Sequence, residues 1–278
     1  MGKVWLVTGA GSGLGTGIAK AALQAGDSVV ATGRSLDKLR HALNAEDTGN
    51  LALVPLDVSD EGQAQSAVLE AIQRFGRIDV LVNNAGYSLL GNFEEMTVQE
   101  IERIFATNFY GVVNVMRAAL PVMRRQRSGH VINLSSLAGV IGFKHCAAYS
   151  ATKFAVEGLS ASVAAEVEQF GIRVSVIEPG FFRTDLLDSK NAQWASQAIE
   201  DYAGEARAEE QWSPYHGTQQ GDPLKLGQVL VKLTRMEHPP LQFHAGSDAL
   251  AAATAGLEAR LEEIRAFADL SKSTDGTF

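Results

Sequence analysis

The sequence predicts an α/β fold in which a doubly wound, seven-stranded parallel sheet carries helices on both faces. Short apolar runs typical of buried strands alternate with longer helical patterns along most of the chain. A glycine-rich turn joins the first apolar run to the first helical pattern. The length of 278 residues, with 46% hydrophobic and 20% charged side chains, suits one large globular domain with a full core.

The expected elements alternate in order along the chain. Strands are expected near residues 3–8, 28–33, 51–56, 79–83, 130–135, 172–178 and 241–245. Helices are expected at about 14–25, 35–46, 60–75, 97–126, 148–170 and 225–237. We expect a single domain over residues 1–270, including a further helix at about 247–270, and a flexible tail over 271–278. In such sheets ligands bind beyond the carboxyl ends of the strands, so functional residues should gather there.

A glycine-rich turn follows the first strand and precedes the first helix. Glycines let the backbone approach a pyrophosphate closely, and the helix N-terminus offers unpaired N–H groups and a positive dipole end. Strand, turn and helix together predict the dinucleotide site of a Rossmann fold. The literal G-x-G-x-x-G spacing is absent, and a plain glycine-rich loop has the same composition. The residues expected at the cofactor are Gly9, Ser12, Gly13, Leu14 and Gly15.

The end of the second strand predicts which cofactor is used. A free ribose 2′-hydroxyl is usually bound by an acidic residue here, whereas a 2′-phosphate needs space and a cation. The chain has Gly33 at the acidic position, followed by Arg34 and Ser35. Gly33 cannot repel a phosphate and Arg34 can bind one, so NADP(H) is favoured over NAD(H). The alternative is an exposed arginine at the start of a helix that Ser35 caps.

Tyr149, Lys153 and Ser136 form the candidate catalytic group. In a helix over 148–170, a spacing of four places Tyr149 and Lys153 on one face, one turn apart. A free phenol has a pKa near ~10, and a neighbouring ammonium lowers that pKa, which makes Tyr149 a usable acid or base. Ser136 would hydrogen-bond the carbonyl or alcohol oxygen. The same spacing also fits an exposed tyrosine and a solvated lysine.

The motifs together resemble the short-chain dehydrogenase/reductase family over about residues 3–250. Those that carry the resemblance are Thr8-Gly9, Gly13, Gly15, Asn83-Asn84-Ala85-Gly86, Asn108, Ser136, Tyr149, Lys153 and Pro179-Gly180. The resemblance implies a tetrad of Asn108, Ser136, Tyr149 and Lys153. Asn108 would help to hold a water that relays protons to Lys153, which would also bind the nicotinamide ribose. Family spacing favours Ser136 over its rival Ser135.

The resemblance also implies further cofactor contacts at the ends of later strands. They are Asp57, Val58, Asn84, Ala85, Gly86, Pro179, Gly180 and Thr184. Two of these have structural alternatives: Asp57 is also suited to an ordinary cap at a strand end, and Asn84 to tying down neighbouring backbone.

Residues 181–222 are expected to form a substrate lid, because the segment has no clear period and is rich in aromatic side chains. These aromatics favour a sizeable hydrophobic carbonyl or alcohol, although packing of the lid onto the core is the alternative for any one of them. The residues expected in the substrate pocket are Leu137, Phe143, His145, Phe181, Leu186 and Trp194, with Cys146 facing the same pocket.

The helix expected at 247–270 departs from the commonest ending of the family and looks more like hydroxysteroid- and retinol-dehydrogenase-type members. Its apolar stripe should be buried, over the lid or in a subunit contact. The members of the stripe are Leu250, Leu257, Leu261, Ile264 and Ala268. A homodimer or homotetramer is expected, with a dimer through the helices at 97–126 and 148–170 as one possibility.

Charge and cysteine content exclude several classes of protein. A net charge of −8 gives no electrostatic footprint for nucleic acid or anionic lipid. The single cysteine and the short first apolar run favour a cytoplasmic protein without a signal peptide. No metal is expected. The sequence favours an NADP(H)-dependent oxidoreductase acting on a small-molecule carbonyl or alcohol. The alternatives are a sugar epimerase or dehydratase of the related extended group, and a non-catalytic NADP(H)-sensing protein.

Overall fold

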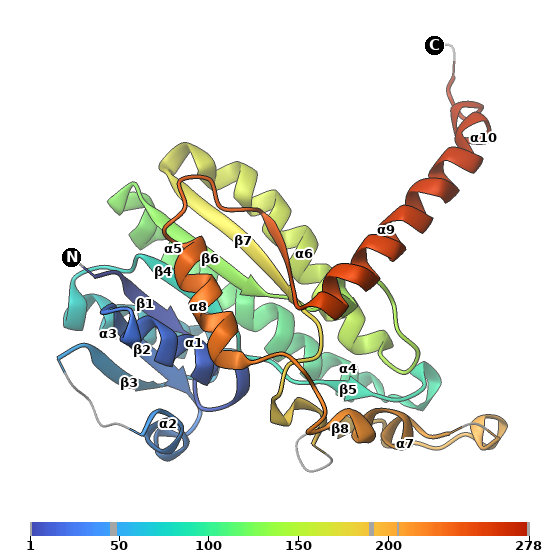
Figure 1. Cartoon of the computed structure of the whole chain (residues 1–278), viewed down its shortest axis with the longest axis horizontal. Helices are drawn as coiled ribbons and strands as arrows, with labels where there is room; N and C mark the ends of the chain where they lie inside the picture. Colours follow the sequence, from blue (N-terminus) through green and yellow to red (C-terminus); the bar gives the residue numbers. More distant parts are fainter. Residues whose placement is uncertain (1, 45–48, 189–191, 205, 277–278) are drawn as a thin grey trace.

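The structure, a computed structural model, describes residues 2–44, 49–188, 192–204 and 206–276. It confirms the predicted α/β fold, with seven parallel strands in the order β3-β2-β1-β4-β6-β7-β9 (Figure 1). The sheet is formed by β1 (Val4–Val7), β2 (Ser28–Gly33), β3 (Leu51–Pro55), β4 (Val80–Asn83), β6 (Gly129–Leu134), β7 (Ile172–Pro179) and β9 (Gln242–Ala245). The strand order reverses between β1 and β4, which is where ligands bind in such sheets.

Helices cover both faces of the sheet (Figure 1). One face packs against α1 (Gly13–Gln24), α2 (Leu36–Leu43) and α8 (Pro223–Leu233), and the other against α3 (Glu61–Phe75), α5 (Gly111–Gln126) and α6 (Ala147–Val167). Along β1, Trp5 and Val7 belong to the first core and Leu6 to the second, as the alternation of side chains in a strand requires. The predicted helix at 225–237 ends at Leu233, and the last residues predicted for 35–46 lie outside the described ranges.

The predicted helix at 97–126 is interrupted by a π-helical turn. The structure has α4 (Val98–Phe105), the π turn η2 (Ala106–Tyr110) and then α5. A Cβ on Gly111 would lie 2.5 Å from the Val58 side chain, so Val58 packs closely against the start of α5. Turns of this kind occur mostly as single insertions within α-helices, frequently at functional sites.

Shorter elements lie around the carboxyl ends of the strands. They are the parallel pair β5 (Leu89–Leu90) and β8 (Gln193–Trp194), and the short helices η1 (Phe93–Glu95) and η3 (Leu137–Gly139). The short helix η4 (Glu168–Phe170) instead precedes the amino end of β7. Residues 181–222, here called the insertion, also contain η5 (Asp185–Leu187), η6 (Glu200–Tyr202), α7 (Ala208–Trp212) and η7 (Ser213–Tyr215). A bridge between Phe182 and Gly221 holds the two ends of the insertion together.

The C-terminal helices α9 (Ser247–Ala266) and α10 (Ala268–Lys272) project away from the sheet (Figure 1). The predicted burial of their apolar stripe is wrong for the single chain, because Leu250, Leu257, Leu261 and Ile264 are 44–59% exposed. Only the first turns of α9 pack on the body. The end of the predicted tail, 277–278, lies outside the described residues. Among those described, no helix is both long and apolar enough to cross a membrane.

Candidate active site

The glycine turn leaves the N-terminus of α1 available to an anion. Ser12 precedes the helix without making a side-chain capping bond, and the first turn carries no acidic residue. Gly9 (φ 65°) and Gly13 (φ 53°) adopt left-handed conformations that favour glycine. A Cβ on Gly15 would overlap the carbonyl oxygen of Gly9. The close turn and the unpaired N–H groups therefore fit a pyrophosphate.

The insertion reaches back to the glycine turn through Thr184. A Cβ on Gly13 would lie 3.2 Å from Thr184 Cγ2. The Thr184 hydroxyl accepts a hydrogen bond from the Leu186 amide at 3.3 Å, which caps η5. A residue far along the chain is thereby placed beside the turn, where the resemblance predicts it.

The segment after β4 holds the backbone of the glycine turn. The backbone N–H of Asn84 donates to Thr8 Oγ1 at 2.9 Å. The side-chain Nδ2 of Asn84 donates to the carbonyl oxygens of Thr8 (2.9 Å) and Gly9 (3.1 Å). The structural role considered for Asn84 is thus present. Ala85 also donates its amide to Thr8 Oγ1, at 3.1 Å. Gly86 lies against Asn108, whose Oδ1 would be 3.0 Å from an added Cβ.

The residues after β2 and β3 are partly used as caps. Ser35 accepts a hydrogen bond from the Lys38 amide at 3.3 Å and so caps α2. The Asp57 carboxylate accepts from the amide and hydroxyl of Ser59 at 3.0 and 2.6 Å. Arg34 is exposed, and within the described ranges its guanidinium makes no hydrogen bond or ion pair. Of these predicted cofactor residues, Arg34 is the one with its charged group available.

The helix α6 places Tyr149 and Lys153 together, as predicted. Lys153 Nζ lies 5.6 Å from the centroid of the Tyr149 ring and donates to the Leu134 carbonyl at 2.8 Å. The expectation that Lys153 lowers the pKa of Tyr149 is not met by the chain alone. Burial raises the pKa of Tyr149 to about 12, against a smaller lowering by a hydrogen bond with Ser136. Burial also lowers the pKa of Lys153 to about 8, against an opposing effect of Glu157.

Both candidate serines follow β6 and line the same cavity. Ser136 Oγ accepts a hydrogen bond from the Ala138 amide at 3.1 Å, at the start of η3, and also interacts with Tyr149. The Ser135 amide donates to the Ile177 carbonyl at 2.8 Å, which fixes its backbone beside β7. The Tyr149 contact favours Ser136 as the serine that acts on the reacting oxygen.

Asn108 lies in the π turn and does not line the cavity. Its Oδ1 accepts from the Tyr87 amide at 3.0 Å, and its Nδ2 donates to the Tyr87 carbonyl at 2.9 Å and to Thr152 Oγ1 at 3.3 Å. Because Thr152 directly precedes Lys153, Asn108 connects the π turn to the helix that carries the lysine.

A largely apolar cavity of about 140 Å³ is lined by two of the four catalytic candidates, Ser136 and Tyr149, and not by Lys153 or Asn108. Tyr149 and Ser136 lie on one side, and Pro179, Gly180 and Thr184 continue the lining toward the glycine turn. Four of the six predicted pocket residues are part of the lining. In full, it consists of Leu14, Ser88, Leu90, Ser135, Ser136, Leu137, Ala138, Phe143, Cys146, Tyr149, Pro179, Gly180, Phe181, Phe182, Thr184, Leu186, Leu187, Trp212 and Gln219.

Two predicted pocket residues, His145 and Trp194, do not line this cavity. His145 is buried in a left-handed conformation (φ 65°), and its carbonyl accepts the Gly91 amide at 2.9 Å. Trp194 belongs to β8, pairs with Leu90 and belongs to an apolar cluster that includes the cavity-lining residues Phe143 and Trp212, without lining the cavity itself. The sequence predicted both residues from their type, but the backbone position of each keeps its side chain out of the lining.

Several lining residues escaped the sequence argument. Ser88 and Leu90 come from the β5 segment, and Gln219 comes from the end of the insertion. For Ser88 and Leu90 the only signal in the sequence is their closeness to the Asn-Asn-Ala-Gly motif. For Gln219 it is its place within the insertion. Trp212, one of the aromatics of the insertion, lies 6.3 Å from Phe143 and 6.2 Å from Phe181 between ring centroids.

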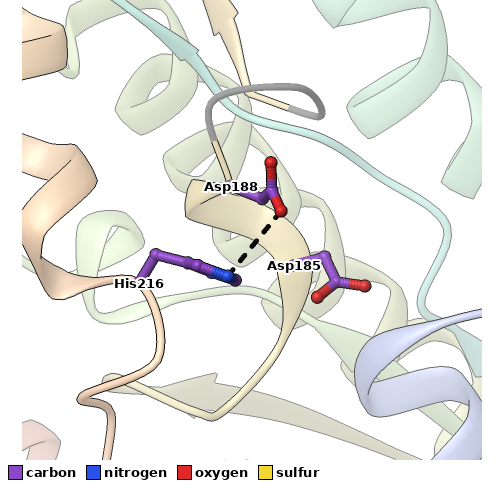
Figure 2. Close-up of side chains that lie close together, drawn as sticks. All are labelled: Asp185, Asp188 and His216. Carbon is purple, nitrogen blue, oxygen red and sulfur yellow. Dashed lines mark ion pairs between the residues drawn. The ribbon is translucent and has the colours of Figure 1, made fainter.

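A polar group lies at the base of the insertion (Figure 2). Ligand atoms of Asp185, Asp188 and His216 lie within 4.8 Å of one another, the one such group of three found among the described residues. His216 Nε2 lies 3.7 Å from Asp188 Oδ2, so the contact is an ion pair when the histidine is protonated. Asp185 and His216 are exposed, and the trio carries no metal assignment.

Comparison with known proteins decides the family. The family model described as short chain dehydrogenase matches residues 3–195. The chain belongs to the short-chain dehydrogenase family. It is 39% identical to "Oxidoreductase BOA17" of Botryotinia fuckeliana over 90% of this chain and 91% of that protein. It is 36% identical to "3-ketodihydrosphingosine reductase" of Bacteroides thetaiotaomicron over 88% of each chain.

Solved structures of this family are similar along the whole chain. A short-chain dehydrogenase from Streptomyces avermitilis is 37% identical, with a TM-score of 0.89 over 99% of each chain. Both nicotinamide cofactors occur among the neighbours. ElxO with NADP bound is 28% identical, with a TM-score of 0.74 over 90% of this chain and 100% of that one. A 3-ketoacyl-(acyl-carrier-protein) reductase from Brucella melitensis complexed with NADH is 26% identical, with a TM-score of 0.73 over 88% and 95%. The family of this chain thus includes solved structures that bind nicotinamide cofactors of both kinds.

Proposed function

We propose that this oxidoreductase is NADP(H)-dependent and interconverts a carbonyl and a primary or secondary alcohol on a hydrophobic substrate. The observation that carries the proposal is the placement of Tyr149 and Ser136 in an apolar cavity whose lining continues to the glycine turn through Leu14 and Thr184. A bound nicotinamide cofactor supplies or accepts the hydride.

Each candidate residue has a distinct role in the proposed reaction. The Tyr149 phenol donates its proton to the carbonyl oxygen during reduction and removes it from the alcohol during oxidation. The Ser136 hydroxyl hydrogen-bonds the same oxygen and fixes its position. The Lys153 ammonium stabilises the phenolate and binds the ribose. Asn108 holds the helix segment next to Lys153 and, by resemblance, the relay water.

The cofactor proposal depends on the end of β2. Gly33 has no side chain to repel a 2′-phosphate, and Arg34 is exposed with an available guanidinium. NADP(H) is therefore favoured over NAD(H). Related structures with each cofactor show that the family fold accepts both. In this proposal, Gly33 and Arg34 therefore determine the preference between NADP(H) and NAD(H).

The substrate proposal depends on the lining of the cavity. Leu90, Phe143, Phe181 and Trp212 give it apolar walls, which favour a long or aromatic apolar group beside the carbonyl. The relative that is a 3-ketodihydrosphingosine reductase supports an apolar ketone. Closure of the insertion over the substrate would exclude water from the reacting atoms.

The proton donor is tested by Tyr149→Phe. Turnover of NADPH with a panel of apolar ketones that includes 3-ketodihydrosphingosine should fall by roughly 10²–10⁴-fold, the usual contribution of a positioned acid. NADPH binding, followed by fluorescence titration, should stay nearly unchanged. Tyr110→Phe, which changes an exposed tyrosine of the π turn, is the matched control and should retain activity.

Two results would redirect the proposal. Activity of Tyr149→Phe within a few fold of the parent would remove Tyr149 as the donor. Tight NADPH binding without turnover of any ketone in the parent protein would support the non-catalytic sensor instead. Turnover of a nucleotide sugar without net NADPH consumption would support the epimerase alternative.

We also propose that the protein is a homo-oligomer, a dimer or a tetramer. The exposed residues Leu250, Leu257 and Ile264 recur every seven residues along α9, the spacing with which helices of two identical chains pack together. Leu257→Glu with Ile264→Glu should lower the mass measured by light scattering if this stripe forms the contact. An unchanged mass would favour a contact through α4, α5 and α6.

A further inference from the structure

A cluster of ionisable side chains adjoins Lys153, and the proposed reaction does not use it. Glu157 follows Lys153 by one turn on α6. Glu178 lies on β7 and is in register with His244 on the neighbouring strand β9. Because side chains of a registered pair project on the same face, the imidazole lies beside the Glu178 carboxyl. Three elements thus bring two acids and one imidazole together near the lysine.

The two carboxyl groups have different surroundings. Glu178 is fully buried, and neither of its oxygens receives a hydrogen bond of ordinary geometry from a described residue. His244 Nδ1 lies against Glu178 Oε2, closer than a hydrogen bond. Glu157, in contrast, receives the Gln242 Nε2 donor at 3.5 Å and also interacts with the hydroxyl of Ser135. Glu157 therefore has a hydrogen-bond donor on one of its two oxygens, whereas Glu178 has none among the described residues.

These surroundings separate the protonation states of the two acids. Burial and, to a smaller extent, the neighbouring Glu157 together raise the pKa of Glu178 to about 8. Burial also raises the pKa of Glu157, but the neighbouring polar groups of Ser135, Gln242 and Glu178 and the charge of Lys153 act in the opposite direction. Two carboxyl groups that share a site do not readily ionise together.

The other ionisable groups on the surrounding elements have different partners. Burial lowers the pKa of His244, so its ring is neutral at neutral pH. His130 on β6 is hydrogen-bonded to Ser175, and Arg173 on β7 pairs with Glu168 at 3.4 Å. Asp248, at the start of α9, accepts the Phe181 amide at 2.7 Å. Lys153 is thus the cation that faces the pair.

We propose that Glu157 and Glu178 share a single proton, held on Glu178, so that the negative charge stays on Glu157 and keeps Lys153 an ammonium. The Glu178 hydroxyl donates to Glu157, and the His244 imidazole N–H donates to the other Glu178 oxygen. The pair then acts as a positioning device for Lys153, which its burial would otherwise make easy to deprotonate. This inference rests on the proposed function for its effect on catalysis, but not for the placement of the proton.

A matched pair of substitutions tests whether the charge that acts on Lys153 is on Glu157 and not on Glu178. Glu178→Gln keeps a donor toward Glu157 and the charge on Glu157, so it should shift the alkaline loss of kcat much less than Glu157→Gln does. Glu157→Gln removes the charge beside Lys153, so the loss of activity at alkaline pH should begin about one pH unit lower, at the low end of what a neighbouring opposite charge produces. The KM for substrate below that range should change little. Equal shifts in both variants, or none in Glu157→Gln, would overturn the link to Lys153.

Infrared difference spectroscopy locates the proton without any need for activity. The parent should show the carbonyl stretch of a protonated carboxylic acid at neutral pH, and the band should disappear as the pH rises beyond about 8. The band should be lost in Glu178→Gln and kept in Glu157→Gln. The reverse pattern, or no such band in the parent, would refute the shared proton. If the parent reduced no carbonyl but kept this band pattern, only the proposed function would fail. If one variant did not fold, the other would still assign the band, because each carboxyl group is removed in only one of them.

Discussion

Cofactor choice provides the sharpest prediction, because it depends on two adjacent residues at the end of β2. Arg34→Ala removes an exposed guanidinium that makes no ion pair in the part of the chain that the structure describes. A hydrogen bond to a charged group is worth about 1.5–3 kcal/mol, so Arg34 should favour NADPH over NADH by roughly ten- to a hundredfold. Arg34→Ala should erase most of that preference.

The double variant Gly33→Asp with Arg34→Ala should reverse the preference. A Cβ on Gly33 would lie 3.5 Å from Leu39 Cδ2, an ordinary contact, so the backbone accepts an aspartate. The new carboxylate repels a 2′-phosphate and can accept hydrogen bonds from the free ribose hydroxyls. NADH should then be the better cofactor.

The assay is kcat/KM for NADPH and NADH in the parent and both variants, because this ratio measures discrimination. Arg40→Ala is the matched control, since Arg40 lies in the last turn of α2 and pairs with Asp37 at 3.0 Å. Its preference should stay that of the parent. A parent that prefers NADH, or a double variant whose preference does not move, would show that Arg34 only starts a helix.

Three further predictions concern packing, pH and the insertion. Gly180→Ala should lower the free energy of unfolding by about 1–3 kcal/mol, because its Cβ would overlap the Asp248 carboxylate; an unchanged melting temperature would contradict this contact. Burial lowers the pKa of His130 to about 4, below its unfolded value of 6.5. The protein should therefore lose about 3 kcal/mol of stability as the pH falls from 6.5 to 4, and His130→Gln should flatten this part of the curve in denaturant titrations. Residues 181–222 should be cleaved by protease in the free protein and protected when NADP(H) and a substrate analogue are both bound; equal cleavage would indicate a fixed insertion.

The sequence predicted the strands of the sheet and the glycine turn well, because both depend on local patterns. Buried strands appear as short apolar runs, and the turn needs glycine wherever φ is positive or a Cβ would overlap the backbone, as at Gly9, Gly13 and Gly15. The spacing of Tyr149 and Lys153 likewise follows from helix geometry alone. These features depend on few neighbours, so one sequence is enough to place them.

The tertiary structure decided which side chains meet and how far they are desolvated. Trp212 lines the cavity and Trp194 does not, although both are tryptophans of the same insertion. The π turn that carries Asn108 leaves no periodic signal, and the apolar stripe of α9 is exposed because the helix leaves the body. The pKa of Tyr149 rises rather than falls, because burial outweighs its polar partners.

The sequence by itself determined the fold class, the glycine turn and the helical spacing of the tyrosine and the lysine. Each of these depends on residues that are close together in the chain. Only the tertiary structure brought Glu178 of β7 beside Glu157 of α6 and His244 of β9. The physical reason is that burial and Coulomb interactions depend on distances between segments far apart in the chain. The protonation of the groups around Lys153 is therefore a property of the folded protein.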